Sequence, residues 1–65
     1  MGIKIRLLQL GKKQVDLLAE IRKRGYKNLQ PPALSAYINR KDTTAQAERV
    51  LELADEILKE WEAEQ

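Results

Sequence analysis

The sequence predicts an all-α fold, a compact domain of four helices, or five, that ends in a long C-terminal helix and takes in the whole chain, 1–65. Three observations support this fold class. Apolar residues recur at spacings of three and four, glycine and proline divide the chain into segments, and no second strand-like run exists to pair with the first segment. A chain of 65 residues can bury one modest core.

The first helix is expected from Gly2 to Leu10. Apolar residues at positions 3, 5, 7, 8 and 10 fit strand alternation at first and helical spacing later, so the period alone leaves both readings open. Leucine is a good helix former, and Gly11 follows where a helix needs a C-terminal cap. Because a lone strand cannot form a sheet, we expect a helix.

A second helix is expected from about Gln14 to Arg24, with Gly25 ending it. Its apolar residues recur at the spacing of one helical face, so this face should be buried. The residues expected on it are Val15, Leu17, Leu18 and Ile21.

The third helix is expected to start near Pro31 and to run to Lys41. This first proline biases Gln30 away from helical dihedrals, and the second proline fits the first turn of a helix. The connection that precedes it has five or six residues, and Tyr26 and Leu29 should fold back as core filler. The residues expected to face the core from the helix itself are Leu34, Tyr37 and Ile38.

From Thr43 onward the helical pattern is the clearest in the chain and predicts a long amphipathic helix. Thr43 and Gln46 have the spacing of a capping box, and Asp42 and Glu48 suit the positive end of the helix dipole. About twenty helical residues would span roughly 30 Å. The apolar stripe consists of Ala47, Val50, Leu51, Ala54, Ile57, Leu58 and Trp61.

The composition excludes several kinds of site. Without cysteine or histidine the chain cannot form disulfides or thiolate metal sites, and it lacks the usual general base and the commonest transition-metal ligand. We therefore expect no enzyme, no metal site, no cofactor and no small-molecule substrate. The amino end does not resemble a signal peptide and no apolar run reaches membrane-spanning length, so we expect a soluble cytoplasmic protein without a membrane partner.

The net charge of +2 hides an uneven distribution. Up to Asp42 there are ten Lys and Arg against three acids, which gives +7, whereas from Thr43 onward two bases stand against seven acids, which gives −5. A basic front and an acidic tail in one small domain suggest one side that faces a polyanion and another that is turned elsewhere.

The stretches LLQLGKKQVDLLAEI and ALSAYINRK resemble the helix-turn-helix of the Cro and phage-repressor family over roughly residues 3–41. In that family the first helix ends in glycine, the second opens with glutamine, and the third ends near an asparagine and a basic residue. The chain departs from the family in a turn five or six residues longer than usual, in Leu18 at a customary alanine and in Arg40 at a customary glycine. The matching positions are Gln14, Leu17, Leu18, Ile21, Leu34, Tyr37, Asn39 and Lys41.

The resemblance implies a sequence-specific transcriptional regulator of phage or mobile-element type, whose partner is double-stranded DNA and whose third helix enters the major groove. Three of the side chains it places at base edges can offer only apolar contact, for example to thymine methyl groups. The residues implied near base edges are Gln30, Pro32, Ala33, Ser35 and Ala36. Those implied at phosphates are Gln14, Asn39, Arg40 and Lys41, and the basic front adds Lys12 and Lys13.

Two other functions stay open on the sequence. The same fold could serve as an architectural or recombination-accessory, excisionase-like factor that binds and bends DNA. In a third hypothesis the chain is a protein-interaction module, whose acidic C-terminal helix docks a partner.

A weak homodimer is also expected. Ile57, Leu58 and Trp61 continue the apolar stripe near the chain end, where so small a domain has little left to cover them. The alternative is that Trp61 packs back onto the first helix in a monomer.

Overall fold

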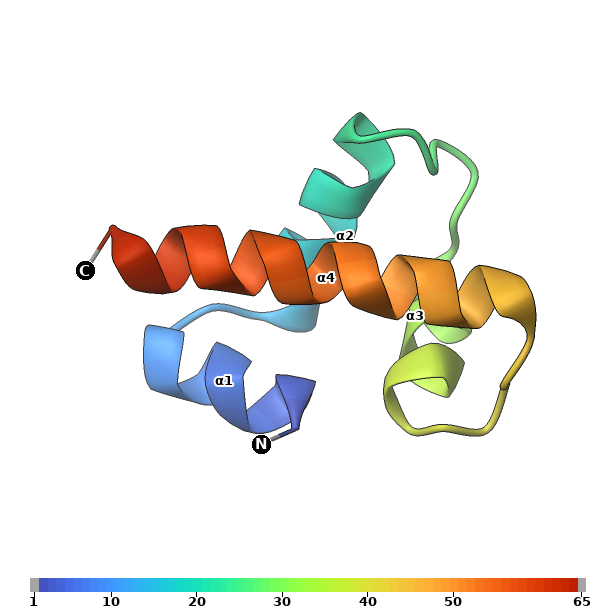
Figure 1. The fold of residues 1–65 in the computed structure, drawn as a ribbon, viewed down its shortest axis with the longest axis horizontal. Coiled ribbons are helices and arrows are strands. Elements are labelled where there is room, and N and C mark those ends of the chain that lie inside the picture. The colour runs from blue at the N-terminus through green and yellow to red at the C-terminus, as the bar shows by residue number, and fades with distance from the viewer. Residues whose placement is uncertain (1, 65) are drawn as a thin grey trace.

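The computed structural model describes residues 2–64, and over that range it contains four α-helices, which confirms the all-α class with four helices rather than five. Figure 1 shows α4 running across the molecule, which measures 32 × 23 × 16 Å. α4 contacts the other three helices, and α2 also contacts α3. The described helices include none that is long and apolar enough to cross a membrane. The helices are α1 (Ile3–Leu10), α2 (Gln14–Lys23), α3 (Pro31–Ile38) and α4 (Ala45–Ala63).

α1 ends in a Schellman motif at the predicted glycine. The N–H groups of Gly11 and Lys12 donate to the carbonyls of Leu8 and Leu7, at 3.1 and 2.9 Å. Gly11 has a φ of 69°, in the left-handed region that glycine adopts without steric cost. The sharp turn leads directly into α2, whose amino end is closed when Asp16 Oδ2 accepts the backbone N–H of Lys13 at 2.8 Å.

α3 ends at Ile38, before the predicted end at Lys41, and uses the same motif as α1. The N–H groups of Arg40 and Lys41 donate to the carbonyls of Tyr37 and Ala36, at 3.1 and 2.9 Å. Arg40 has a φ of 60° and is the only non-glycine residue with a positive φ within residues 2–64. A side chain in this conformation costs about 1–2 kcal/mol relative to glycine.

The cap of α4 lies one residue later than predicted. Thr44, not Thr43, holds the capping position: its Oγ1 accepts the N–H of Ala47 at 3.3 Å. The carboxylate of Asp42 accepts the N–H of Thr44 at 3.0 Å, which fixes the approach of the chain. Thr43 and Thr44 each carry a hydroxyl that could cap the helix. The hydrogen bond from the Thr44 N–H to Asp42 decides that Thr44 does so.

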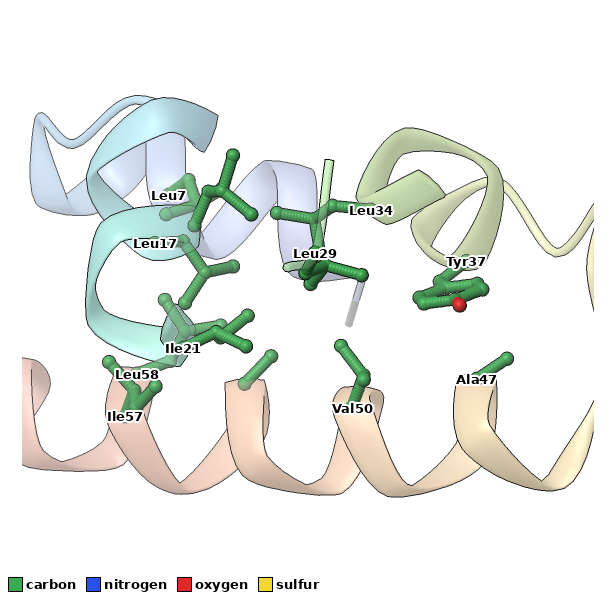
Figure 2. Packing of buried hydrophobic residues seen from close by; sticks show 12 residues of the cluster. Leu7, Leu17, Ile21, Leu29, Leu34, Tyr37, Ala47, Val50, Ile57 and Leu58 are labelled. Carbon is green, nitrogen blue, oxygen red and sulfur yellow. The ribbon is translucent and has the colours of Figure 1, made fainter. Parts of the chain in front are cut away.

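The core lies between α4 and the other three helices. Figure 2 shows side chains of α4 pointing toward those of α1, α2, α3 and the turn before α3. Eight of the core residues are less than 2 % exposed, so they are removed from water. The cluster consists of Leu7, Leu17, Leu18, Ile21, Leu29, Leu34, Tyr37, Ala47, Val50, Ala54, Ile57 and Leu58.

One predicted core position is wrong, and the predicted core residues Ile38 and Leu51 are only half-buried. Val15 is 61 % exposed, because it sits in the first turn of α2, where no helix covers it fully. Leu51 is half-buried and lines a groove between α1 and α4. Both residues keep the helical spacing of the stripe, but they lie on its flank. The prediction that Tyr26 and Leu29 fold back is confirmed, since Leu29 is buried and Tyr26 is half-buried against the same cluster.

Two arginines tie α4 to α1 and α2. Arg6 of α1 forms ion pairs with Asp55 and Glu62, the latter with a Nη2 to Oε1 distance of 2.7 Å. Arg24, after α2, donates two hydrogen bonds of 2.9 Å to the two carboxylate oxygens of Glu60. The acidic helix α4 thus uses three of its carboxylates inside the protomer.

These contacts predict an acid limit to stability. Hydrogen bonds from Arg6 lower the pKa of Asp55 and of Glu62, and hydrogen bonds from Arg24 lower the pKa of Glu60. A carboxyl whose folded-state pKa lies below its unfolded value stabilises the fold above that unfolded value, about 4 for Asp and Glu, and the contribution is lost as the pH falls through the folded pKa. The melting temperature should therefore be flat above about pH 5 and fall below about pH 4.

The test is a series of thermal melts of the protein and of an Arg6→Gln variant. The substitution removes the cause of the lowered pKa of Asp55 and Glu62, so the variant should melt lower than the parent at neutral pH and approach it at acid pH. A constant difference between the two melting curves across this range would contradict the linkage.

Candidate nucleic-acid interface

Most of the residues predicted near base edges lie outside the core, on α3 or just before it, whereas Ala33 packs against the edge of the core. Positions 32, 33 and 36 follow helical spacing and share one face, whereas Leu34 and Tyr37 on the other face are buried. Gln30 and Pro32 are exposed, and Ala33, Ser35 and Ala36 are half-buried. This face is free to approach a second molecule.

The first turns of α2 and α3 lie side by side. Gln14 and Val15 share a narrow cleft of about 30 Å³ with Leu18, Pro31 and Leu34. The leucine at the position where the family has alanine therefore faces both helices, and its side chain is 4 % exposed. Gln14 is thus placed beside the amino end of α3. The resemblance implies that it meets a phosphate at the amino end of its own helix, α2.

Asn39 and Ser35 are linked on the surface of α3. The Nδ2 of Asn39 donates to the Oγ of Ser35 at 3.2 Å, one helical turn away. The serine hydroxyl keeps its proton and can still donate to an acceptor outside the protein. The carboxyamide oxygen of Asn39 is oriented by the same contact.

Lys12 and Lys13 stand next to each other in the turn between α1 and α2 but have different surroundings. The Nζ of Lys12 lies 5.2 Å from the centroid of the Trp61 ring, a cation–π distance. Lys13 is exposed, and its backbone N–H donates to the carboxylate of Asp16. Trp61 therefore has a contact within the protomer that links the end of α4 to this turn.

Arg40 faces two surroundings at once. It is exposed in the turn between α3 and α4, next to exposed Lys41, and it also lines the groove between α1 and α4 together with Glu48 and Glu52. No ion pair joins Arg40 to a carboxylate within the described residues. Its guanidinium is available to an external anion.

The charges segregate by element. Between Ile21 and Lys41 the sequence contains no Asp or Glu but six Lys and Arg. Five of the cations that form no ion pair within residues 2–64 lie in the three interhelical turns. They are Lys12, Lys13, Lys27, Arg40 and Lys41. α3 is therefore bordered by cations at its two ends, and the carboxylates gather on α4.

The predicted dimer contact is wrong for two of its three residues. Ile57 and Leu58 are 0 % exposed, because α1 and α2 cover this part of α4, so neither can touch a second copy. Trp61 is half-buried and packs against the core of its own protomer. The apolar stripe near the end of α4 was expected to lack a covering element within the protomer. The short helix α1 is enough to help cover it.

Sequence reasoning missed the donors of the turn between α2 and α3. Lys27 and Asn28 lie in a hollow beside α3 together with Gln30, which was predicted. The length of this turn is a departure from the family, and its lack of carboxylates is visible in the sequence.

Comparison of the chain with family models, with curated proteins and with solved structures gave no match in any of the three searches.

Proposed function

We propose that this chain is a non-enzymatic protein that binds duplex DNA in the cytoplasm and acts as a sequence-specific transcriptional regulator of phage or mobile-element type. In this proposal α3 enters the major groove, the only groove wide enough for a helix and the one in which each base pair presents a distinct pattern. The setting and the regulatory role rest on the resemblance to the Cro and phage-repressor family.

One observation carries the proposal: the separation of cations and carboxylates around α3. The stretch from Ile21 to Lys41 includes the whole of α3 and contains no acid. Meanwhile the carboxylates Asp55, Glu60 and Glu62 are engaged with arginines inside the protomer. A surface that must approach closely spaced phosphates needs this arrangement, since each uncompensated carboxylate there would repel the backbone.

The proposed contacts divide into two groups. Lys13, Arg40 and Lys41 flank α3 and would hold phosphates, which fixes orientation without reading sequence. The small, half-buried residues of this α3 face would allow the helix to sit deep in the groove, with apolar contact to thymine methyl groups and polar contact from Gln30 and Ser35.

The test is a titration of a labelled random-sequence duplex at salt concentrations from about 50 to 200 mM. If Lys12, Lys13, Arg40 and Lys41 each replace counterions at a phosphate, the logarithm of the affinity should fall with the logarithm of salt at a slope of about −3.6, or about a hundredfold over this range. A slope near zero would end the DNA proposal.

Selection from a pool of random duplexes then separates the regulator from an architectural factor. A regulator should enrich one motif, and Ala36→Leu, which fills the exposed face of α3, should change that motif while leaving the salt slope as it is. An architectural factor should enrich no base motif and should shorten the end-to-end distance of a duplex labelled at its two ends.

The groove between α1 and α4 favours a second candidate function, a protein-interaction module. The groove is lined by the apolar residues Ile3 and Leu51, by four carboxylates and by three cations. The carboxylates are Glu48, Glu52, Asp55 and Glu56, and the cations are Arg6, Arg40 and Lys59. Apolar area bordered by carboxylates suits a basic amphipathic helix. Saturable binding of a basic amphipathic peptide, with no binding of duplex DNA at low salt, would favour this function over the first.

A further inference from the structure

The turn between α2 and α3, residues 24–30, is a structured element with its own surface. The Nε of Arg22 donates to the carbonyl of Leu29 at 2.8 Å, and the N–H of Leu29 donates to the carbonyl of Tyr26 at 3.1 Å. The Leu29 side chain is 6 % exposed and belongs to the core, so it anchors the end of the turn. The backbone between these anchors is therefore held in place beside α3.

A hollow of about 480 Å³ lies between this turn and the adjoining parts of α3 and α4. Among the residues of known placement, those that line it include Lys27, Asn28, Gln30 and Gln46, and no carboxylate. Their side chains carry one ammonium group and three amide groups, all of which bear N–H donors. The groove between α1 and α4 differs, since four carboxylates line it together with three cations.

Lys27 is the free cation of this hollow. Arg24, at the start of the same turn, is held by Glu60 and Glu20 and faces α4. Lys27 is exposed and forms no ion pair within residues 2–64. Ala33, on the predicted base-reading face of α3, lines the same hollow, which places Lys27 at the border of that face.

We infer that this hollow binds a backbone phosphate of the same DNA duplex, at a position that flanks the base pairs read by α3. Lys27 supplies the charge and Asn28 supplies an amide donor, and the absence of carboxylates among the lining residues removes repulsion. The inference rests on the proposed function, because the phosphate reaches the hollow only when α3 lies in the groove. The lengthened turn thus adds a contact to the DNA footprint.

The first experiment compares Lys27→Ala with Lys59→Ala in titrations of a random-sequence duplex over a range of salt. Both variants lose one positive charge, but Lys59 lies on α4 and pairs with Asp55. Lys27→Ala should reduce the magnitude of the logarithmic salt slope by about 0.9, and Lys59→Ala should leave it unchanged. Thermal melts should show that both variants are folded. Equal slopes for the two variants would overturn the inference.

A second experiment locates the phosphate. On a duplex obtained by selection, single phosphates are replaced by uncharged methylphosphonates, and the affinity of the parent and of Lys27→Ala is measured for each position. At one flanking position the replacement should weaken the parent but not the variant, because the partner of the lost charge is already gone. Losses that add at every position would contradict a direct contact.

Asn28 provides an independent readout. Asn28→Asp keeps the shape of the side chain but places a carboxylate in the hollow, so it should weaken binding more than Asn28→Ala does. Equal weakening by the two variants would mean that no phosphate lies there. If the unmodified protein fails to bind any duplex at low salt, the proposed function falls, whereas a steep slope that Lys27→Ala does not change overturns this inference alone.

Discussion

Replacement of Leu34 by Ala should lower the free energy of unfolding by about 2–5 kcal/mol, because it removes buried methyl groups and leaves a cavity among packed neighbours. Leu34 is 0 % exposed and belongs to the cluster between α3, α2 and α4. A loss of this size is comparable with the total stability of so small a domain. We expect most molecules of the variant to be unfolded at room temperature, as measured by circular dichroism in a urea titration.

Leu8→Ala is the matched control. It is the same chemical change in a helix of similar length, but Leu8 is 80 % exposed, so its truncation should alter stability by no more than about 0.5 kcal/mol. Leu17→Ala should behave like the Leu34 variant, because Leu17 is also 0 % exposed. Equal losses for Leu8 and Leu34 would mean that the assignment of helix faces is wrong.

Leu51→Ala distinguishes the structure from the sequence pattern. On spacing alone, Leu51 occupies the inward stripe of the last helix. Its truncation to Ala should then lower the free energy of unfolding as much as Leu34→Ala does. It is half-buried, so we expect a loss clearly below that of Leu34→Ala in the same urea titration. The ratio of these two losses measures how far periodicity overstates burial at the edge of a stripe.

Much of the fold could be predicted because helix-breaking residues stand between runs of clear period. Gly11 and the proline pair bound three of the helices, and the last helix has an apolar residue at nearly every third or fourth position. The errors lie at edges. Val15 keeps the correct spacing and borders a cleft with α3, yet it stays 61 % exposed in the first turn of α2. Thr44 rather than Thr43 caps α4, because tertiary placement decides such cases.

The candidate site was harder to predict from the sequence. Which of its cations are paired is decided by contacts between residues that are far apart along the chain. Arg6 appears in the sequence as one more cation of a basic front, but its partner Glu62 lies 56 residues away. Lys12 likewise reaches Trp61 through the meeting of α1 and α4. Local spacing carries no information about such pairs. The face of α3, by contrast, follows from its own period.

The ion pairs of the two arginines also make the distribution of charge on the molecule uneven. Arg6 and Arg24 pair with carboxylates of α4, whereas the other three cations in the turns that border α3 form no ion pair within residues 2–64. These three are Lys27, Arg40 and Lys41. The net charge of +2 therefore understates the field that a polyanion would meet on that side.

Arg40→Gly should stabilise the protein and weaken its binding to DNA. Arg40 occupies the left-handed position of a Schellman motif, which glycine fills at the end of α1. Removal of the side chain relieves a cost of about 1–2 kcal/mol, part of which is offset by the greater freedom of glycine in the unfolded chain, so we expect a gain of about 1 kcal/mol in the free energy of unfolding. The same change removes a proposed phosphate contact and should reduce the salt slope by about 0.9.

Two controls separate the backbone effect from the charge effect. Lys41→Ala removes a neighbouring cation without relieving a left-handed residue, so it should weaken DNA binding and leave stability unchanged. Gly11→Ala forces a side chain into a φ of 69° with nothing within 4 Å of its Cβ, so it should cost about 1 kcal/mol and leave the salt slope unchanged.

The outcome for Arg40→Gly decides what the arginine does at a position suited to glycine. A gain in stability with a loss of DNA affinity would mean that the strain is retained for a contact with DNA. A loss of stability would instead mean that the guanidinium is held by Glu48 and Glu52 in the adjoining groove, strongly enough to outweigh the strain. In that case Arg40 would belong to the scaffold, and the phosphate contacts beside α3 would be left to Lys13 and Lys41.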